Sequence, residues 1–353
     1  MMERNVNANW LGTCRGIAVI GVILTHLLPY IDSKFELHSE IIRAITVDII
    51  DTGKIGVALL FMIAGFLAFA SKKKRTVKQF VINRFFRLYP LYWLDIALVG
   101  IIFAFDNYDL DTIIANITML QVFFHKEDLV GVFWTLPIEL MLYLGAIFFE
   151  KYIWNYKKVL FLELIGALGS IVIAIVRKTI WASAPVAIGL LLTIGLLGQI
   201  FRLYKNDEVS IKHLNIAIFI FETCLICSSL LAYQSDNGYQ ENWHRYVLSY
   251  SFAVIIFTVF FVTKKNFSPL AIIAEIAYPI YLLQEIVFRV AFNKIWQQEM
   301  DKVLFICGML LALIGVSFIV HVLIERPAII IGNKIEKKLT TGKNINTKVL
   351  SCE

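Results

Sequence analysis

Long runs of apolar residues, separated by short polar segments, dominate the chain from residue 11 onward. Many of these runs reach the roughly 17–25 residues that an α-helix needs to cross a bilayer. We predict spanning helices near residues 11–29, 55–71, 89–105, 130–149, 158–176, 184–201, 214–233, 246–263, 269–292 and 303–324. The pattern therefore predicts an all-α, polytopic membrane helical bundle of about ten transmembrane helices.

Two segments fall outside this set of spans. The apolar stretch 112–124 is too short to cross, and we expect it to be interfacial or re-entrant. The tail 336–353 is polar and is expected to be a disordered cytoplasmic segment. Residues 1–335 are then predicted to form one transmembrane domain.

Basic residues gather in the loops that would lie on one side of the membrane. Short loops rich in Lys and Arg stay cytoplasmic, so both termini are predicted to be cytoplasmic. The loops after the second, fourth, sixth, eighth and tenth spans carry this excess: Lys72, Lys73, Lys74, Arg75, Lys78, Arg84, Arg87, Lys151, Lys157, Lys158, Arg202, Lys205, Lys212, Lys264, Lys265, Lys334, Lys337 and Lys338.

Composition supports the membrane class and narrows the chemistry. Hydrophobic residues make up 59% of the chain and charged residues 17%, whereas soluble domains carry roughly 25% charged residues. No feature points to a nucleic-acid partner, and the sequence leaves the oligomeric state open. The histidines His26, His213, His244 and His321 share no ligand spacing, so no metal site is predicted.

The first span contains an arginine and a histidine eleven positions apart, Arg15 and His26. At 100° per residue this spacing gives three turns plus about 20°, so both side chains lie on one face of a helix. The rise between them is about 16 Å, roughly half of a bilayer core. A cation and an imidazole are costly inside a membrane, so a functional role is the default hypothesis.

Other ionisable residues within the predicted spans are few, and each is expected to face the bundle interior or water. His321 lies one helical turn before Glu325, which predicts a local pair. The full set beyond the first span is Asp95, Glu139, Glu163, Glu222, Glu275, Glu285, Arg289, His321 and Glu325.

Six short motifs follow one another along the chain: Arg15 through His26, the segment 61–67 (FMIAGFL), the segment 84–90 (RFFRLYP), the segment 133–139 (FWTLPIE) with Tyr143, the segment 276–283 (IAYPIYLL) and the segment 324–327 (IERP). Together they resemble the motifs of the acyltransferase family 3 membrane proteins, which are O-acyltransferases of cell-surface carbohydrates. The resemblance covers about residues 8–330, and the six motifs occur in the family's order.

The resemblance implies transfer of a short acyl group, often acetyl, from cytoplasmic acyl-CoA to a hydroxyl of a cell-surface or exported carbohydrate. Acyl-CoA is then a co-substrate, and no bound cofactor is implied. The protein is expected in the cell membrane, plasma or inner, of a bacterium. Trp134 and Tyr281 fall in the family motifs and are expected to bind substrate.

Specific roles follow for the charged motif residues. A general base must take the proton of the acceptor hydroxyl, and His26 is the candidate because the ordinary pKa of histidine is near 6.5. Arg15, Arg84 and Arg87 are expected to bind the CoA phosphates, which the guanidinium fork suits. Glu139 is a second catalytic candidate, for which three roles stay open: orienting His26, binding the acceptor or pairing with an arginine.

Other interpretations of these residues stay open. Arg15 alone is consistent with a side chain that extends to the lipid headgroups, and His26 alone with a packed polar residue. A transporter or flippase that moves a glycan or its acylated precursor without covalent chemistry would also carry intramembrane acidic residues. The two functions differ in whether a thioester is consumed.

Overall fold

The computed structural model describes residues 9–105, 108–233 and 242–349 of the chain, and its side chains within residues 10–339. Most of these residues are helical, and they include no strand. Ten helical segments among them are long and apolar enough to cross a membrane. The prediction of a polytopic all-α bundle is therefore confirmed, whereas the cytoplasmic placement of the termini stays a prediction.

The chain divides into two compact units, each assembled from segments far apart in sequence. The first unit contains Met1–Ala70, Thr135–Ala277 and Phe292–Trp296, and the second contains Ser71–Trp134, Tyr278–Ala291 and Gln297–Glu353. The prediction of a single domain over 1–335 stays a prediction.

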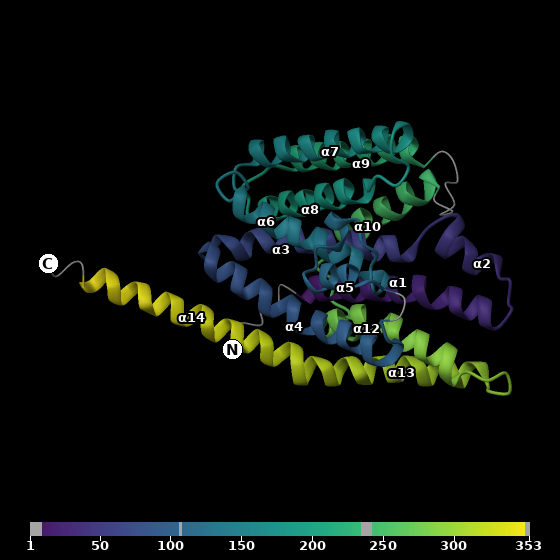
Figure 1. Cartoon of the computed structure of the whole chain (residues 1–353). Coiled ribbons are helices and arrows are strands. Elements are labelled where there is room, and N and C mark those ends of the chain that lie inside the picture. The colour runs from purple at the N-terminus through teal and green to yellow at the C-terminus, as the bar shows by residue number, and fades with distance from the viewer. Residues whose placement is uncertain (1–8, 106–107, 234–241, 350–353) are drawn as a thin grey trace. The chain divides into compact units, whose positions relative to one another are not determined.

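The first unit holds most of the long helices (Figure 1). Within it α7, α8 and α9 pack against one another, and α1 packs against α10 and α11. Its elements are α1 (Asn9–Lys34), α2 (Glu40–Arg43), η2 (Ala44–Asp48), α3 (Thr52–Lys73), α6 (Thr135–Phe148), α7 (Tyr156–Thr179), α8 (Val186–Lys205), α9 (Ile211–Ala232), α10 (Trp243–Thr263), α11 (Ser268–Ile273) and η5 (Ala274–Ile276).

Small residues allow α1 to approach its neighbours closely. A Cβ atom on Gly56 of α3 would lie 2.3 Å from the carbonyl oxygen of Ala18, and one on Gly16 would lie 2.3 Å from that of Leu270. Backbones can come this near only where no side chain intervenes, as is typical of membrane helices. These close approaches fix the rotation of α1 about its axis.

In the second unit, the long C-terminal helix packs along α4. In Figure 1 this helix, α14, is the yellow ribbon. The elements are α4 (Val77–Phe103), α5 (Leu110–Ile117), η3 (Gln121–Phe124), η4 (Gly131–Trp134), α12 (Ala277–Val290), α13 (Lys302–Val320), η7 (His321–Glu325) and α14 (Arg326–Val349). The short η6 (Ala291–Ile295) follows α12 in the chain and, apart from Ala291, belongs to the first unit. Neither α5 nor η3 is among the segments long enough to cross, which agrees with a non-spanning 112–124.

The structure corrects the sequence prediction at the basic segment after the second span. The sequence predicts a loop there and a helix from residue 89, but α3 continues to Lys73 and α4 already begins at Val77. Thr76 caps α4: its hydroxyl accepts the N–H of Gln79, and the Gln79 side chain accepts the N–H of Thr76. This capping box starts a helix irrespective of the cationic residues that follow it.

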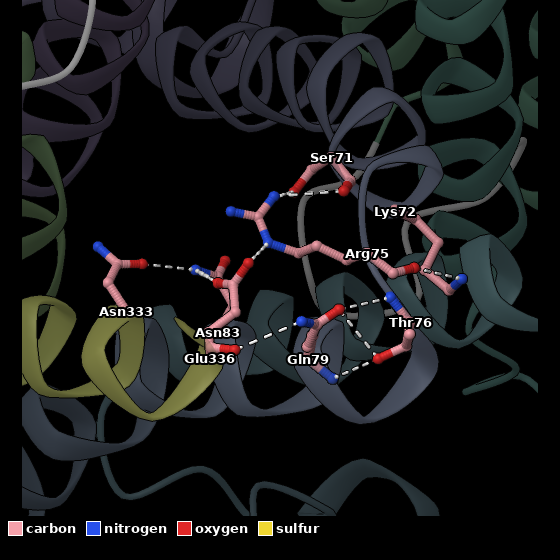
Figure 2. A network of polar contacts seen from close by, with 8 residues as sticks. All are labelled: Ser71, Lys72, Arg75, Thr76, Gln79, Asn83, Asn333 and Glu336. Carbon is pink, nitrogen blue, oxygen red and sulfur yellow. Dashed lines mark hydrogen bonds and ion pairs between the residues drawn. The ribbon is translucent and has the colours of Figure 1, made fainter. Parts of the chain in front are cut away.

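The tail expected to be disordered from residue 336 is instead part of α14, which runs to Val349. Glu336, the first residue of the tail, accepts hydrogen bonds from Arg75 Nε at 2.8 Å and from Asn83 Nδ2 at 3.3 Å. Figure 2 shows these contacts with the bond between Asn83 and Asn333, at 3.2 Å. Tertiary contacts with the start of α4 therefore order a segment whose composition is polar.

Candidate functional site

Arg15 and His26 lie on one unbroken helix, α1, as their spacing predicted. Both side chains are half-buried. Val19 and Val22 lie between them on the same stripe and are only 1% and 2% exposed. A lipid-facing stripe would leave these valines exposed, so the face that carries Arg15 and His26 is turned into the protein. Their separation along the helix axis is about 16 Å.

A polar network that the sequence analysis missed holds the His26 end of α1. Thr25, the residue before His26, donates a hydrogen bond from its hydroxyl to Asp51 Oδ1 at 2.9 Å. Asp51 Oδ2 accepts a hydrogen bond from Arg245 Nη2 at 2.6 Å and lies 3.3 Å from Lys54 Nζ. Asp51 also accepts the N–H groups of Gly53 and Lys54 at the start of α3. The network ties α1, α3 and α10 together beside His26.

The sequence near Asp51 predicts its role at the start of α3, but it does not predict its ion pair with Arg245. Aspartate directly before an apolar helix is a typical N-cap, so Asp51 was recognisable as a helix start. Its ion pair with Arg245 joins residues 194 positions apart, and no local pattern predicts that partner.

Glu139 lies on the second turn of α6 and is half-buried. The hydroxyl of Tyr143, one turn further along α6, donates a short hydrogen bond to Glu139 Oε1. Tyr143 was quoted with the motif 133–139, but no role was predicted for it from the sequence. Trp134 is half-buried at the end of η4, directly before α6 begins.

Arg84 and Arg87 lie one turn apart on α4. Arg84 is half-buried, with its guanidinium carbon 5.0 Å from the centre of the Phe80 ring, whereas Arg87 is exposed. The capping box at Thr76 and the contacts of Asn83 with α14 hold this end of the helix (Figure 2). The start of α4 is therefore a firmly placed cationic surface.

Tyr281 is buried on α12, and its hydroxyl donates to the carbonyl oxygen of Val132 at 3.1 Å. Its neighbour one turn earlier, Tyr278, donates to the carbonyl oxygen of Leu88 at 2.9 Å. Both hydroxyls thus bind backbone, and the Tyr281 bond holds the η4 segment that ends at Trp134. The expected contact of Tyr281 with substrate stays a prediction.

Acidic groups gather in the second unit around Glu285. Glu285 Oε2 accepts the N–H of Gly131 at 2.7 Å, and its Oε1 lies 3.5 Å from Arg289 Nε. Asp95 on α4 is completely buried, and neither of its carboxyl oxygens has a hydrogen-bond partner in the described part of the chain. The charge of Glu285 acts on both Asp95 and Asp128. Asp95 therefore faces the interior, as predicted for a charge within a span.

Asp128 lies in the connection before η4, outside the spanning helices. Burial of its carboxyl group raises the pKa of Asp128 to about 6. The hydrogen bond from Gln121 Nε2, at 2.8 Å, opposes this rise, and the negative charge of Glu285 adds to it. The group therefore titrates close to neutral pH.

The remaining ionisable residues within the spans are mostly internal. His321 Nδ1 lies 2.7 Å from Glu325 Oε2, which confirms the predicted local pair. Glu222 accepts a hydrogen bond from Ser251 at 2.6 Å, and Glu163 is fully buried. Glu275 differs from the expectation of an interior position, because its side chain is exposed near the end of α11.

Comparison with known proteins identifies the family. A search of curated proteins and a search of solved structures found no match. The family model described as "Acyltransferase domain", that of acyltransferase family 3, matches residues 8–322 of the 353. This match includes five of the six motifs and all ten spanning segments except the end of the last. The chain therefore belongs to acyltransferase family 3 and is a multi-pass membrane acyltransferase.

Proposed function

We propose that the protein transfers a short acyl group, acetyl, from cytoplasmic acyl-CoA to a hydroxyl of a cell-surface or exported carbohydrate. The observation that carries this proposal is the buried stripe of α1, on which Arg15 and His26 flank Val19 and Val22. A cation and an imidazole on an inward face are available to a reactant inside the protein. If the same two groups faced lipid, their exposure to the hydrocarbon core would be unfavourable in free energy.

His26 acts as the general base. In a direct transfer, the acceptor oxygen attacks the thioester carbonyl carbon while its proton passes to the imidazole. The carbon–sulfur bond then breaks, and the departing CoA sulfur takes the proton back from the imidazolium. An ester and free CoA result, and His26 returns to its neutral form.

The arginines bind the donor. A guanidinium group binds phosphate through two parallel N–H donors and keeps its charge at all relevant pH values. Arg15 stands about 16 Å along α1 from His26, a distance that an extended pantetheine arm covers. Arg84 and Arg87 offer the same chemistry on a firmly held helix start.

Glu139 binds the acceptor. Tyr143 occupies its Oε1, and Oε2 has no hydrogen-bond partner in the described residues. An oriented carboxylate oxygen of this kind accepts a hydrogen bond from a sugar hydroxyl. Trp134 and Tyr281 are proposed to contact substrate from η4 and α12.

The test uses membranes that contain the protein and their own surface glycan, supplied with acetyl-CoA labelled in the acetyl group. We expect free CoA and alkali-labile label in carbohydrate, and loss of both in His26→Ala. The matched control is His213→Ala, because His213 lies outside the proposed site, at the start of α9, where its ring contacts Ser210. Label transfer that persists in His26→Ala would remove this residue from the mechanism. An intact thioester in every sample would favour the transporter.

A further inference from the structure

Five aromatic side chains form a compact cluster at one end of the first unit. We call Trp10, Phe66, Phe201, Phe257 and Phe261 the aromatic cluster; each is no more than 5% exposed. The Trp10 ring lies 5.8, 5.4 and 5.6 Å from the rings of Phe66, Phe257 and Phe261, all edge-to-face. The cluster joins the start of α1 to the ends of α3, α8 and α10.

Three cations lie against these rings. The guanidinium carbon of Arg202 is 4.9 Å from the centre of the Phe66 ring, and Lys205 Nζ is 5.9 Å from the same centre. Lys264 Nζ lies 3.7 Å from the Phe261 ring and 4.9 Å from the Trp10 ring. Attraction to ring faces holds such cations. We call Arg202, Lys205 and Lys264 the cation cluster.

The cation cluster has no acidic partner in the described part of the chain. None of its three members forms an ion pair there, and Arg202 Nε is buried without a hydrogen-bond acceptor. Nearby Glu208 instead accepts a hydrogen bond from Asn206 at 3.2 Å. Lys264 lies just beyond the span of α10, and its pKa is lowered by burial and then by the charge of Lys205. The three positive charges thus repel one another, and no acidic side chain of the described residues pairs with them.

The backbone at Lys264 is an independent sign that this side chain is needed. Lys264 ends α10 in the left-handed conformation, with φ 52° and ψ 19°, and its N–H binds the carbonyl oxygen of Phe260 at 3.0 Å. Glycine or asparagine suits this position better than a long side chain. A lysine at this position incurs backbone strain, and in this conformation its ammonium group lies against two aromatic rings.

Topology and helix dipoles explain why basic residues lie at these helix ends. They do not explain why three of them converge on one buried ring cluster where none pairs with a carboxylate of the described residues. Lys205 and Lys264 are exposed and Arg202 is half-buried, so an anion can reach all three from water or from the headgroup layer. An arginine fork beside two ammonium groups matches the oxygens of a phosphate.

We propose that the cation cluster is a binding site for the phosphate groups of an anionic ligand, beside Trp10 at the same end of α1 as Arg15. Two molecules carry this chemistry: the nucleotide portion of the acyl-CoA donor and the headgroup of an anionic phospholipid. The first source rests on the proposed function, whereas the second does not.

The test measures ligand binding by the full-length protein in nanodiscs. In one arm the lipid is phosphatidylcholine and the probe is acetyl-CoA, compared with acetyl-CoA that lacks the 3′-phosphate. In the other arm no nucleotide is present, and the shift in melting temperature on replacing phosphatidylcholine by phosphatidylglycerol is measured. Lys264→Asn is the main variant because asparagine accepts the left-handed backbone, and Lys205→Gln is the second. Lys265→Asn is the matched control, since the adjacent lysine is exposed and contacts no aromatic ring of the described residues.

We expect Lys264→Asn and Lys205→Gln either to lower the affinity for acetyl-CoA about tenfold or to abolish most of the melting-temperature shift caused by phosphatidylglycerol. Lys265→Asn should change either quantity less than twofold. Loss of acetyl-CoA affinity assigns the site to the donor, and loss of the phosphatidylglycerol shift assigns it to lipid. Unchanged responses in both arms for both variants would overturn the proposal. In that case, loss of acyl transfer in His26→Ala would still support the proposed function. Failure of the proposed phosphate site is therefore distinguishable from failure of the proposed function.

Discussion

The Tyr143 hydroxyl donates a hydrogen bond to the Glu139 carboxylate, one turn away on α6. This bond fixes one oxygen of a carboxylate within a membrane span. Because it bonds a charged acceptor, its loss costs about 1.5–3 kcal/mol. Glu139 without it would sample other rotamers.

Tyr143→Phe therefore tests whether the orientation of Glu139 serves catalysis. We expect kcat to fall about tenfold or more, with little change in the KM of acetyl-CoA, because the donor does not contact Glu139 in the proposed arrangement. Steady-state kinetics of the reconstituted enzyme measures both constants. Tyr152→Phe is the control, since Tyr152 is 45% exposed. Unchanged kcat in Tyr143→Phe would mean that the bond is only structural.

Arg15 is predicted to bind donor phosphate through its guanidinium fork. Arg15→Lys keeps the charge but loses the two parallel donors, so the KM of acetyl-CoA should rise about tenfold, and Arg15→Ala should raise it further. Isotope-labelled transfer at varied donor concentration gives these values. Arg43→Ala, which removes a 62% exposed side chain, should leave KM unchanged. Normal donor dependence in Arg15→Ala would indicate that the side chain only reaches the headgroups.

The Asp51 network is predicted to stabilise the end of α1 that carries His26. In Asp51→Asn the Arg245 guanidinium, only 11% exposed, loses its carboxylate partner. Breaking such a buried pair costs about 3–5 kcal/mol, so the melting temperature of the detergent-solubilised protein should fall. Asp48→Asn breaks the exposed pair with Arg43, where the side chains are 46% and 62% exposed, and should cost about 0–1 kcal/mol. Equal effects of the two substitutions would contradict this assignment.

Asp128 gives the stability a predictable dependence on pH. Its pKa of about 6 in the folded state lies above its ordinary value of 3.8, so the fold favours the protonated form. The contribution of this group to stability is present below pH 3.8 and is lost as the pH rises to about 6. Asp128→Asn should remove this loss, so the variant should melt at a higher temperature than the parent above pH 6 and at the same temperature near pH 3.5. Parallel melting curves across this range would refute the assignment.

Truncation separates the two parts of α14. A chain that ends at Ile335 lacks Glu336 and loses the hydrogen bonds from Arg75 and Asn83 (Figure 2), and it should be destabilised by about 1–3 kcal/mol. A chain that ends at Leu339 keeps these contacts and should melt close to the full-length protein. Thermal unfolding of both proteins, with equal detergent and pH, decides between a structural role and a dispensable tail.

Much of the fold is predictable from the sequence because hydropathy and capping are local properties. Each span must satisfy its own backbone hydrogen bonds in lipid, so about twenty apolar residues predict a helix without reference to the rest of the chain. The start of α4 was missed because its basic residues lower the hydropathy, although Thr76 and Gln79 formed a readable cap. The ordered part of the tail was missed because Glu336 finds Arg75 261 positions away.

By itself, the sequence determined that Arg15 and His26 share a face, because eleven residues on any α-helix give that result. Only the tertiary structure decided that this face is turned inward, since the burial of Val19 and Val22 depends on the helices packed around α1. The pair between Asp51 and Arg245 and the convergence of three cations on one ring cluster were decided in the same way. Helical periodicity is a property of the local chain, whereas the orientation and partners of each face depend on which distant helices pack against it.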